Sequence, residues 1–321
     1  MKIIHVGRQV GMFPTLQEAI DRIAEDHREP VRVVLEPGVY REKVVVNKDF
    51  VEIVGYGAEV VWDDYALQLL PDGTTKNTFL TATMLVTGAD VTLRGLTVRN
   101  DAGDGRKVGQ AVALYAAGDR FACFECRFVA AQDTLYTGPV LWKLHHHTSR
   151  VIPLGVENVA DRPDTDARQY YHRCFIQGDV DFIFGPYRCW FEECTLYANA
   201  RGGYYTAANT QMDQPYGLVF HRCRLTGECE KGEMYLGRPW REGAATAFLE
   251  CEMGECVHPA GFCDWESPFR AVTRRLCEYG TYGVDTSARN QAAGWLTPEE
   301  AKEYTMEKVL NGWKPPEETG R

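Results

Sequence analysis

Two aspartates lie in apolar stretches of the chain. Asp181 lies in "GDVDFIFGP" (178–186), where β-forming residues bounded by glycines predict a short buried strand. Asp133 lies in "AAQDTLYTG" (130–138). A buried ionised carboxylate is costly unless a cation or hydrogen-bond donors compensate for the lost water. Each aspartate therefore needs such a partner or a chemical task.

The spacing of the aspartates repeats the spacing of two cysteines. Asp133 follows Cys126 by seven positions, Asp181 follows Cys174 by seven, and both pairs are 48 residues apart. In a solenoid, residues at the same distance from the repeated position of each coil lie on one face of successive coils. We therefore expect the two carboxylates to be close in space. When two carboxyl groups lie close together, the pKa of one is lowered and that of the other is raised. One can then be an ionised nucleophile and the other a protonated acid.

Other side chains have the chemistry to assist such a pair. Arg238 lies in "YLGRPWR" (235–241), where its planar guanidinium can bind a carboxylate at two points. Gln110 and Gln132 can direct amide N–H groups at developing negative charge, and Trp240 can stack on a sugar face. Each of these alone is equally typical of a turn, a surface charge or a core residue. Their combination favours a catalytic site.

Five segments share a pattern in which an aromatic residue precedes a cysteine. They are "FECRF" (124–128), "YHRCFI" (171–176), "FEECTL" (191–196), "FHRCRL" (220–225) and "FLECEM" (248–253). The steps between their cysteines are 48, 20, 29 and 28 residues, which is the size of one β-solenoid coil, with an insertion in the first step. "VTLRGLTVRN" (91–100) has the same rhythm, with Gly95 in the cysteine position. The pattern predicts an all-β solenoid of stacked parallel strands with cysteines in its core, and the alternative is a β-sandwich.

Helices are expected at both ends of a single domain covering residues 1–321. Apolar residues recur at helical spacing over about 14–26. Near the other end, Thr297 as N-cap, Pro298 and Glu300 form a capping-box pattern that predicts a helix over about 298–311. A solenoid needs covered ends, and these helices can supply or flank them.

Composition excludes several classes of protein. The net charge is -10 and the pI near 5.4, which disfavours nucleic-acid and anionic-membrane partners. No stretch approaches the roughly 20 apolar residues of a membrane span. "MKIIHVGRQVGMF" has no export signal, so we expect a cytoplasmic protein, secreted only if a leader was trimmed. The eleven cysteines are then free, small core residues and not a disulfide framework or zinc knuckles.

The sequence disfavours three other classes of protein. Only three serines exist and none lies in a G-x-S-x-G elbow, which argues against a serine esterase. A calcium-dependent polysaccharide lyase would need an acidic metal cluster and a base. A non-catalytic carbohydrate-binding solenoid would be expected to lose at least one of five polar residues, and all five are present: Asp133, Asp181, Gln110, Gln132 and Arg238. His145, His146 and His147 have no carboxylate or cysteine at metal-ligand spacing, so no metal or other cofactor is expected.

Four motifs, "QAVAL", "QDTLY", "GDVDFIFG" and "YLGRPW", occur in the order of the signature motifs of pectin methylesterases, and the chain resembles that family from "FPTLQEAI" to about Tyr282. The resemblance implies a right-handed parallel β-helix. It also implies hydrolysis of galacturonate methyl esters in homogalacturonan or oligogalacturonides to free carboxylate and methanol. A monomer without cofactor is expected.

The resemblance also implies roles for individual residues. Asp181 would be the nucleophile, Asp133 the general acid and then base, Gln110 and Gln132 the oxyanion donors, and Arg238 the group that orients Asp181. The substrate-binding candidates are Tyr136, Phe184 and Trp240, followed by Thr78, Arg201 and Tyr204.

The chain departs from the family pattern in "GPYRCWF", in "WREGAAT" and in an insertion over residues 139–166. We expect this insertion to form a loop beside the cleft that limits the length of the substrate. Short methylated oligogalacturonides imported into the cell are the expected substrates.

Overall fold

A computed structural model describes residues 1–140, 167–264, 275–289 and 294–317. The insertion over 139–166, apart from its first two residues, and His145, His146 and His147 lie outside these ranges. The chain forms two compact units, residues 1–164 and 165–321, which are described in turn.

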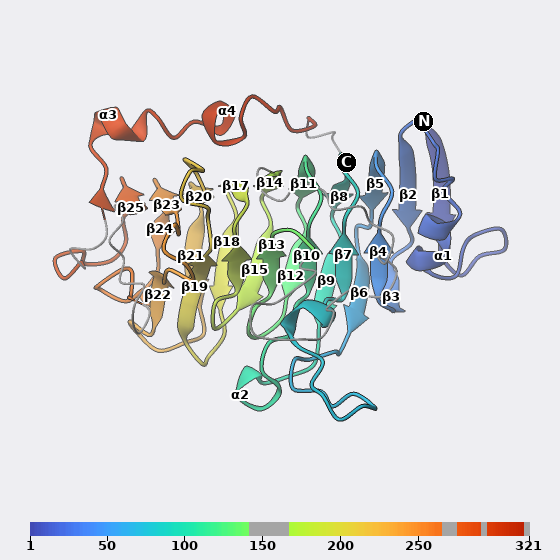
Figure 1. Ribbon diagram of the computed structural model, residues 1–321, viewed down its shortest axis with the longest axis horizontal. Helices are drawn as coiled ribbons and strands as arrows, with labels where there is room; N and C mark the ends of the chain where they lie inside the picture. The colour runs from blue at the N-terminus through green and yellow to red at the C-terminus, as the bar shows by residue number, and fades with distance from the viewer. Residues whose placement is uncertain (141–166, 265–274, 290–293, 318–321) are drawn as a thin grey trace. The chain divides into compact units, whose positions relative to one another are not determined.

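Unit 1 is a stack of β-coils in which each full coil gives one strand to each of three parallel sheets (Figure 1). Its first sheet contains β1 (Lys2–Val6), β2 (Val31–Leu35), β5 (Val51–Val54), β8 (Thr92–Arg94) and β11 (Phe121–Phe124). The second contains β4 (Val44–Val46), β7 (Met84–Val86), β10 (Leu114–Ala116) and β13 (Leu135–Thr137). The third contains β3 (Gly38–Arg41), β6 (Ala58–Trp62), β9 (Thr97–Asn100) and β12 (Arg127–Val129).

Unit 2 repeats this arrangement. Its first sheet contains β14 (Arg168–His172), β17 (Arg188–Glu192), β20 (Leu218–His221), β23 (Thr246–Leu249), β25 (Leu276–Tyr279) and β26 (Gly294–Trp295). The second contains β16 (Ile183–Gly185), β19 (Gly203–Ala208) and β22 (Met234–Gly237). The third contains β15 (Phe175–Gly178), β18 (Thr195–Ala198), β21 (Arg224–Gly227) and β24 (Glu252–Met253). The predicted fold class, an all-β parallel β-helix, is confirmed.

The repeated cysteines lie directly after a sharp turn between the first and third sheets. The residue before each of them has a left-handed backbone, with φ between 50° and 53°; these residues are Glu125, Arg173, Glu193, Arg222 and Glu250. The five cysteines that follow are at most 1% exposed. The prediction that they are core residues is confirmed.

The alignment of Gly95 with the cysteines was wrong by one position. Gly95 has φ of 64° and is itself the left-handed turn residue, so buried Leu96 occupies the cysteine position. The backbone amide of Arg127, which follows Cys126, bonds to the carbonyl of Leu96 at 2.9 Å and so fixes this register. A glycine there relieves the strain of the turn, which elsewhere falls on glutamate or arginine.

The aromatic residues of the repeat form a stacked column in the core of unit 2. Successive ring centroids of Tyr171, Phe191, Phe220 and Phe248 are 4.5, 4.5 and 4.7 Å apart. These distances are close to the spacing of about 4.7–4.9 Å between neighbouring strands. The rings therefore stack because each lies at the same position of its coil.

The N-terminal helix is shorter than predicted. α1 covers Leu16–Asp21, with Thr15 as N-cap, and buries Leu16, Ala19 and Ile20. It ends because the N–H of Ile23 bonds to the carbonyl of Ile20, three residues back, which tightens the last turn. Its contacts with β1, β2 and β4 place it at the N-terminal end of unit 1 (Figure 1).

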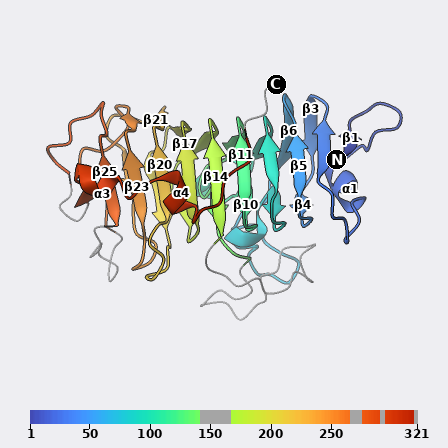
Figure 2. The ribbon, with the colours of Figure 1, turned by 90° about the horizontal axis from the view of Figure 1, so that it is seen from above.

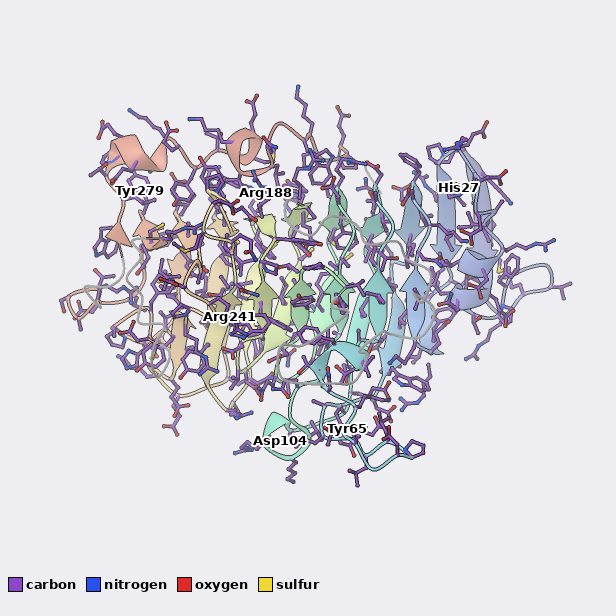
Figure 3. The ribbon with its side chains drawn as sticks, viewed as in Figure 1. His27, Tyr65, Asp104, Arg188, Arg241 and Tyr279 are labelled. Atoms are coloured by element: carbon purple, nitrogen blue, oxygen red, sulfur yellow. The ribbon has the colours of Figure 1, made fainter. Side chains whose placement is uncertain are left out.

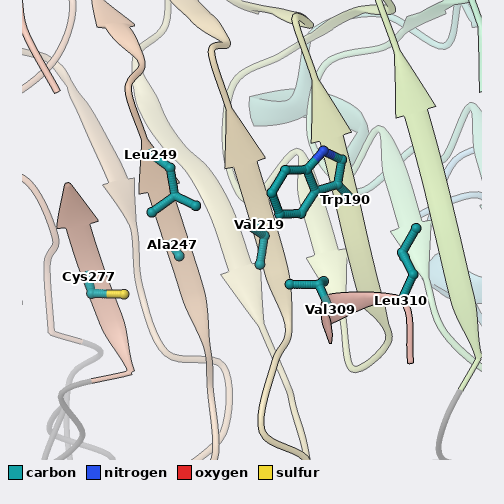
Figure 4. Packing of buried hydrophobic residues seen from close by; sticks show 7 residues of the cluster. All are labelled: Trp190, Val219, Ala247, Leu249, Cys277, Val309 and Leu310. Carbon is teal, nitrogen blue, oxygen red and sulfur yellow. The ribbon is translucent and has the colours of Figure 1, made fainter. Parts of the chain in front are cut away.

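The predicted C-terminal helix is two short helices, α3 (Pro298–Ala301) and α4 (Met306–Val309). The capping box between Thr297 and Glu300 is confirmed. The break occurs because extended Thr305 caps a second helix through its side chain. α4 packs over β17, where Val309 and Leu310 belong to one apolar cluster with Trp190 of β17 (Figures 2 and 4).

Candidate active site

The two aspartates occupy matching positions in their own coils. Asp133 lies two residues before β13 and Asp181 two residues before β16, with φ of 64° and 53°. The prediction that Asp181 lies within a strand was therefore wrong, because the strand begins at Ile183. A left-handed backbone at a residue other than glycine costs about 1–3 kcal/mol and is concentrated at functional sites. Asp133 is 8% exposed and Asp181 7%.

Arg238 binds Asp181 with both arms of its guanidinium group. Its Nε donates to Oδ1 at 2.9 Å and its Nη2 to Oδ2 at 2.6 Å. The predicted contact is thus present in unit 2. Burial raises the pKa of Asp181 above its ordinary value, and the bonds and charge of Arg238 act against that rise. The carboxylate is therefore poorly hydrated and held in one orientation by its cation.

A stack of rings lies beside the guanidinium of Arg238. The guanidinium carbon lies 4.0 Å from the ring centroid of Tyr204. Tyr204 stacks on Tyr235 at 5.7 Å, and Tyr235 stacks on His258 at 4.1 Å. Tyr204, predicted to bind substrate, therefore contacts the residue that orients Asp181. Sequence reasoning missed Tyr235 and His258, because their coils contain no repeated pattern at those positions.

Another acid of unit 2 lies near Asp181. Asp179 is 3% exposed, and its charge contributes to the raised pKa of Asp181. Arg201, another predicted substrate-binding residue, has its Nη1 3.7 Å from Oδ1 of Asp179. Sequence reasoning did not assign a role to Asp179, although it is the first of the two acids in "GDVDF".

Trp240 and Phe184 form an aromatic pair in unit 2. Their ring centroids are 5.9 Å apart with edge-to-face geometry. Phe184 is 3% exposed, whereas Trp240 is only partly buried. The guanidinium of Arg241, labelled in Figure 3, lies 5.1 Å from the ring centroid of Trp240. A partly exposed indole beside apolar surface can bind the C–H face of a sugar.

In unit 1, Gln110 and Gln132 are partners in an isolated parallel bridge. The amide N–H of Ala111 donates to the carbonyl of Gln132 at 3.0 Å and fixes this register. Both glutamines are partly buried, and Asp133 follows Gln132 directly. The two glutamines and Asp133 therefore lie shortly before neighbouring strands of the second sheet, Gln110 before β10 and Gln132 and Asp133 before β13.

Tyr136 lies on β13, three residues after Asp133, and is 1% exposed. Its ring packs edge to face against Tyr115 at 4.7 Å and Phe79 at 5.1 Å. Thr78 begins the short 3-10 helix η1 (Thr78–Leu80) and is partly buried. Sequence reasoning included Thr78 but missed Phe79, the neighbour that contacts Tyr136.

Among the described residues, no group of three or more histidine, cysteine, aspartate or glutamate side chains is placed to hold a metal ion. Within the same ranges, no helix is long and apolar enough to cross a membrane.

The remaining short helix, α2 (Gly105–Val108), is capped by Asp104.

The fold and these side chains together are those of a β-helical hydrolase. The pectinesterase family model matches residues 3–140 and 164–313. The chain belongs to the pectinesterase family, whose members are carboxylic ester hydrolases.

Individual relatives agree with this assignment. Pectinesterase QRT1 of Arabidopsis thaliana is 28% identical over 94% of this chain and 75% of its own length. Other plant relatives are longer, and the chain spans about half of them. The pectin methylesterase PemA from Erwinia chrysanthemi has a TM-score of 0.78 at 26% identity, over 98% of each chain. A pectin methylesterase in complex with a hexasaccharide has a TM-score of 0.80 at 26% identity, over 99% of each chain.

Proposed function

We propose that this chain is a pectin methylesterase in which Asp181 attacks the methyl ester of a galacturonate unit. The observation that carries the proposal is the buried, two-point contact between Asp181 and Arg238. Membership of the pectinesterase family supports it, as does the hexasaccharide bound in a similar pectin methylesterase.

The mechanism requires Asp133 to lie beside Asp181. Support comes from their matching positions, each two residues before a strand of its unit's second sheet and each with a left-handed backbone. Together with the equal spacing in sequence, these matching positions support the proposal that the two aspartates act together.

In the first step, a carboxylate oxygen of Asp181 attacks the ester carbonyl carbon and the bond to the methoxy oxygen breaks. Protonated Asp133 gives its proton to the departing methoxy group, so methanol leaves and an anhydride with Asp181 remains. Gln110 and Gln132 donate N–H bonds to the oxyanion that develops on the carbonyl oxygen.

In the second step, Asp133, now ionised, takes a proton from water as the water oxygen attacks the galacturonate carbonyl carbon of the anhydride. The bond to Asp181 breaks, which restores its carboxylate and releases a free galacturonate. Arg238 favours this return because it binds the ionised form of Asp181 at two points.

We further propose short methylated oligogalacturonides as substrates, acted on by a monomer in the cytoplasm. The acidic net charge of -10 agrees with a substrate whose carboxylates are masked as esters. All eleven cysteines lie in described residues and none forms a disulfide, which suits a reducing compartment. Cell fractionation tests this location, and recovery of the chain outside the cytoplasm would contradict it.

Methanol release from methylated oligogalacturonides tests the activity, with unsaturated sugar products measured in parallel. We expect methanol without unsaturated product, at a rate unchanged by calcium or EDTA. Unsaturated product that depends on calcium would instead indicate a polysaccharide lyase. Binding without either product would indicate a non-catalytic carbohydrate-binding protein.

A further inference from the structure

The backbone register of unit 2 places the rings of Tyr204, Tyr235 and His258 in one stack. Tyr204 of β19 and Tyr235 of β22 are register partners. The N–H of His258 donates to the carbonyl of Met234, the residue before Tyr235, at 2.7 Å. His258 therefore follows Tyr235 in the next coil, where its ring stacks on the tyrosine. The stack begins at the guanidinium of Arg238, which lies against Tyr204.

Two hydrogen bonds hold the imidazole of His258 in one orientation. Its Nδ1 accepts from the backbone N–H of Ala260 at 3.0 Å, so the neutral ring carries its proton on Nε2. This Nε2 lies 3.2 Å from the hydroxyl oxygen of Tyr235. Burial and the positive charge of Arg289 lower the pKa of His258, which favours the neutral form. The stack therefore ends in a neutral ring with a fixed position.

A buried ion pair fixes the loop that carries His258. Nη1 of Arg289 donates to the carbonyl oxygens of His258 at 2.9 Å and of Pro259 at 3.1 Å. Its Nε lies 3.0 Å from Oε1 of Glu278, and its Nη2 donates to Oε2 at 3.1 Å. Both charged side chains are at most 4% exposed. Gly261 has φ of 71°, and a Cβ there would lie 2.9 Å from Cδ of Arg289, so the loop is shaped around this arginine.

We propose that Tyr235 and His258 are positioning residues for Arg238. Their rings keep Tyr204 against the guanidinium, whose carbon lies 4.0 Å from the centre of the Tyr204 ring. A guanidinium that rests on a fixed ring has less freedom to rotate. Its Nε and Nη2 therefore face the carboxylate of Asp181 before substrate arrives.

The proposal rests on the proposed function, in which Arg238 orients Asp181. It gives the ring stack a task different from the substrate binding that the sequence predicted for Tyr204. The two tasks differ in their kinetics. A group that positions the reacting atoms lowers kcat when it is lost, whereas a group that only binds substrate raises KM.

The first measurement is methanol release by variants that remove one ring at a time. Tyr235→Leu removes the middle ring. His258→Asn removes the last ring, while the new side-chain oxygen can replace Nδ1 as the acceptor for Ala260, so the loop should fold. We expect each variant to lower kcat about tenfold or more with little change in KM, because Arg238 leaves its two-point contact. Tyr235→Phe keeps the ring and should keep most of kcat.

Tyr197→Leu is the matched control. Tyr197 of β18 forms an aromatic pair with Phe175 on the third sheet of unit 2, with ring centroids 5.4 Å apart. It is partly buried, like Tyr235, but belongs to a different sheet. Its replacement removes a similar aromatic contact outside the stack and should leave kcat unchanged.

The second measurement does not depend on activity. Hydrogen exchange of the Arg238 Nε–H is followed by heteronuclear NMR of the full chain without substrate, with the signal assigned by its absence in Arg238→Lys. This exchange reports the hydrogen bond to Asp181. We expect slow exchange in the wild type and in Tyr197→Leu. In Tyr235→Leu and His258→Asn it should be about tenfold faster or more.

Unchanged kcat and unchanged Nε–H exchange in folded Tyr235→Leu and His258→Asn would overturn the proposal. A raised KM alone would also overturn it, because it would indicate that the rings bind substrate. An equal loss of kcat in Tyr197→Leu would do the same, since it would indicate a general loosening of unit 2. If exchange accelerates in the two ring variants while the wild type releases no methanol, the positioning role stands and the proposed esterase function fails.

Discussion

At the residue scale, the central feature is a carboxylate whose burial is compensated by a single cation. Burial raises the pKa of Asp181, and Arg238 opposes that rise through two hydrogen bonds and its charge. The nucleophile must be ionised, so activity should fall as the pH drops through the pKa of Asp181. Because this pKa is raised, the fall should begin above the ordinary range of an aspartate.

Replacing Arg238 should shift the fall in activity at low pH to still higher pH. In Arg238→Ala, Asp181 loses the hydrogen bonds and the positive charge that lower its pKa, so its pKa rises further. The pH below which kcat/KM falls should therefore shift upward. The free energy of unfolding near neutral pH should also fall by about 3–5 kcal/mol, because a buried charge loses its partner. Arg222→Ala, which removes an exposed pair with Glu250, is the control and should change neither quantity appreciably. A pH profile of Arg238→Ala identical to that of the wild type would refute this electrostatic role.

Residue types in motifs made the contact between Asp181 and Arg238 predictable, but not the contacts that surround it. Tyr204, Tyr235 and His258 come from coils of unequal length, so no fixed spacing links them. The pair of Asp179 and Arg201 likewise joins neighbouring coils without a repeated pattern. Such contacts depend on register, which an isolated sequence leaves open where coil lengths vary.

At the element scale, the coil repeat was predictable because cysteine and aromatic residues recur at one position of each coil. The misplacement of Gly95 shows what periodicity misses: the turn residue is left-handed, and elsewhere in the ladder it is glutamate or arginine. The length of the C-terminal helix was overestimated for a related reason. Thr305 fits the helical pattern, yet its side chain caps a new helix, and local capping overrode periodicity.

The stacked aromatic column should contribute much of the stability of unit 2. Phe220 is fully buried between Phe191 and Phe248, so Phe220→Ala leaves a cavity and should cost about 3–5 kcal/mol of unfolding free energy. Met212→Ala, at a residue that is 64% exposed, is the control and should have little effect. Urea unfolding followed by far-ultraviolet circular dichroism measures both. A loss below about 1 kcal/mol for Phe220→Ala would contradict the role of the column as a packed core.

At the scale of the whole molecule, the residues proposed to be catalytic are divided between the two β-helical units. Unit 1 supplies Asp133, Gln110 and Gln132, and unit 2 supplies Asp181 and Arg238. The single domain over residues 1–321 stays a prediction, as does the role of the insertion over 139–166. Fold and family were predictable because four motifs occur in one order, whereas the proposal that Asp133 acts together with Asp181 rests on the matching positions of the two aspartates in their own coils.

We expect reducing agents to change neither the activity nor the stability of the protein. None of the eleven cysteines, all of which lie in described residues, forms a disulfide, and ten of them are buried. Methanol release and melting temperature should therefore be the same with and without strong reductant. A loss of activity or stability in reductant would show that a disulfide forms in solution and would contradict the thiol ladder.

The most direct test of the mechanism compares Asp181→Asn with Asp133→Asn by methanol release, with circular dichroism as the check of folding. Each substitution keeps the side-chain shape while removing the nucleophilic charge or the transferable proton. We predict that both variants fold like the wild type and that Asp181→Asn lowers kcat by about 10³-fold or more, with a comparable loss for Asp133→Asn. Near-normal methanol release by either folded variant would contradict the assignment of that residue, and for Asp181 it would reduce the carboxylate to a structural anchor for Arg238.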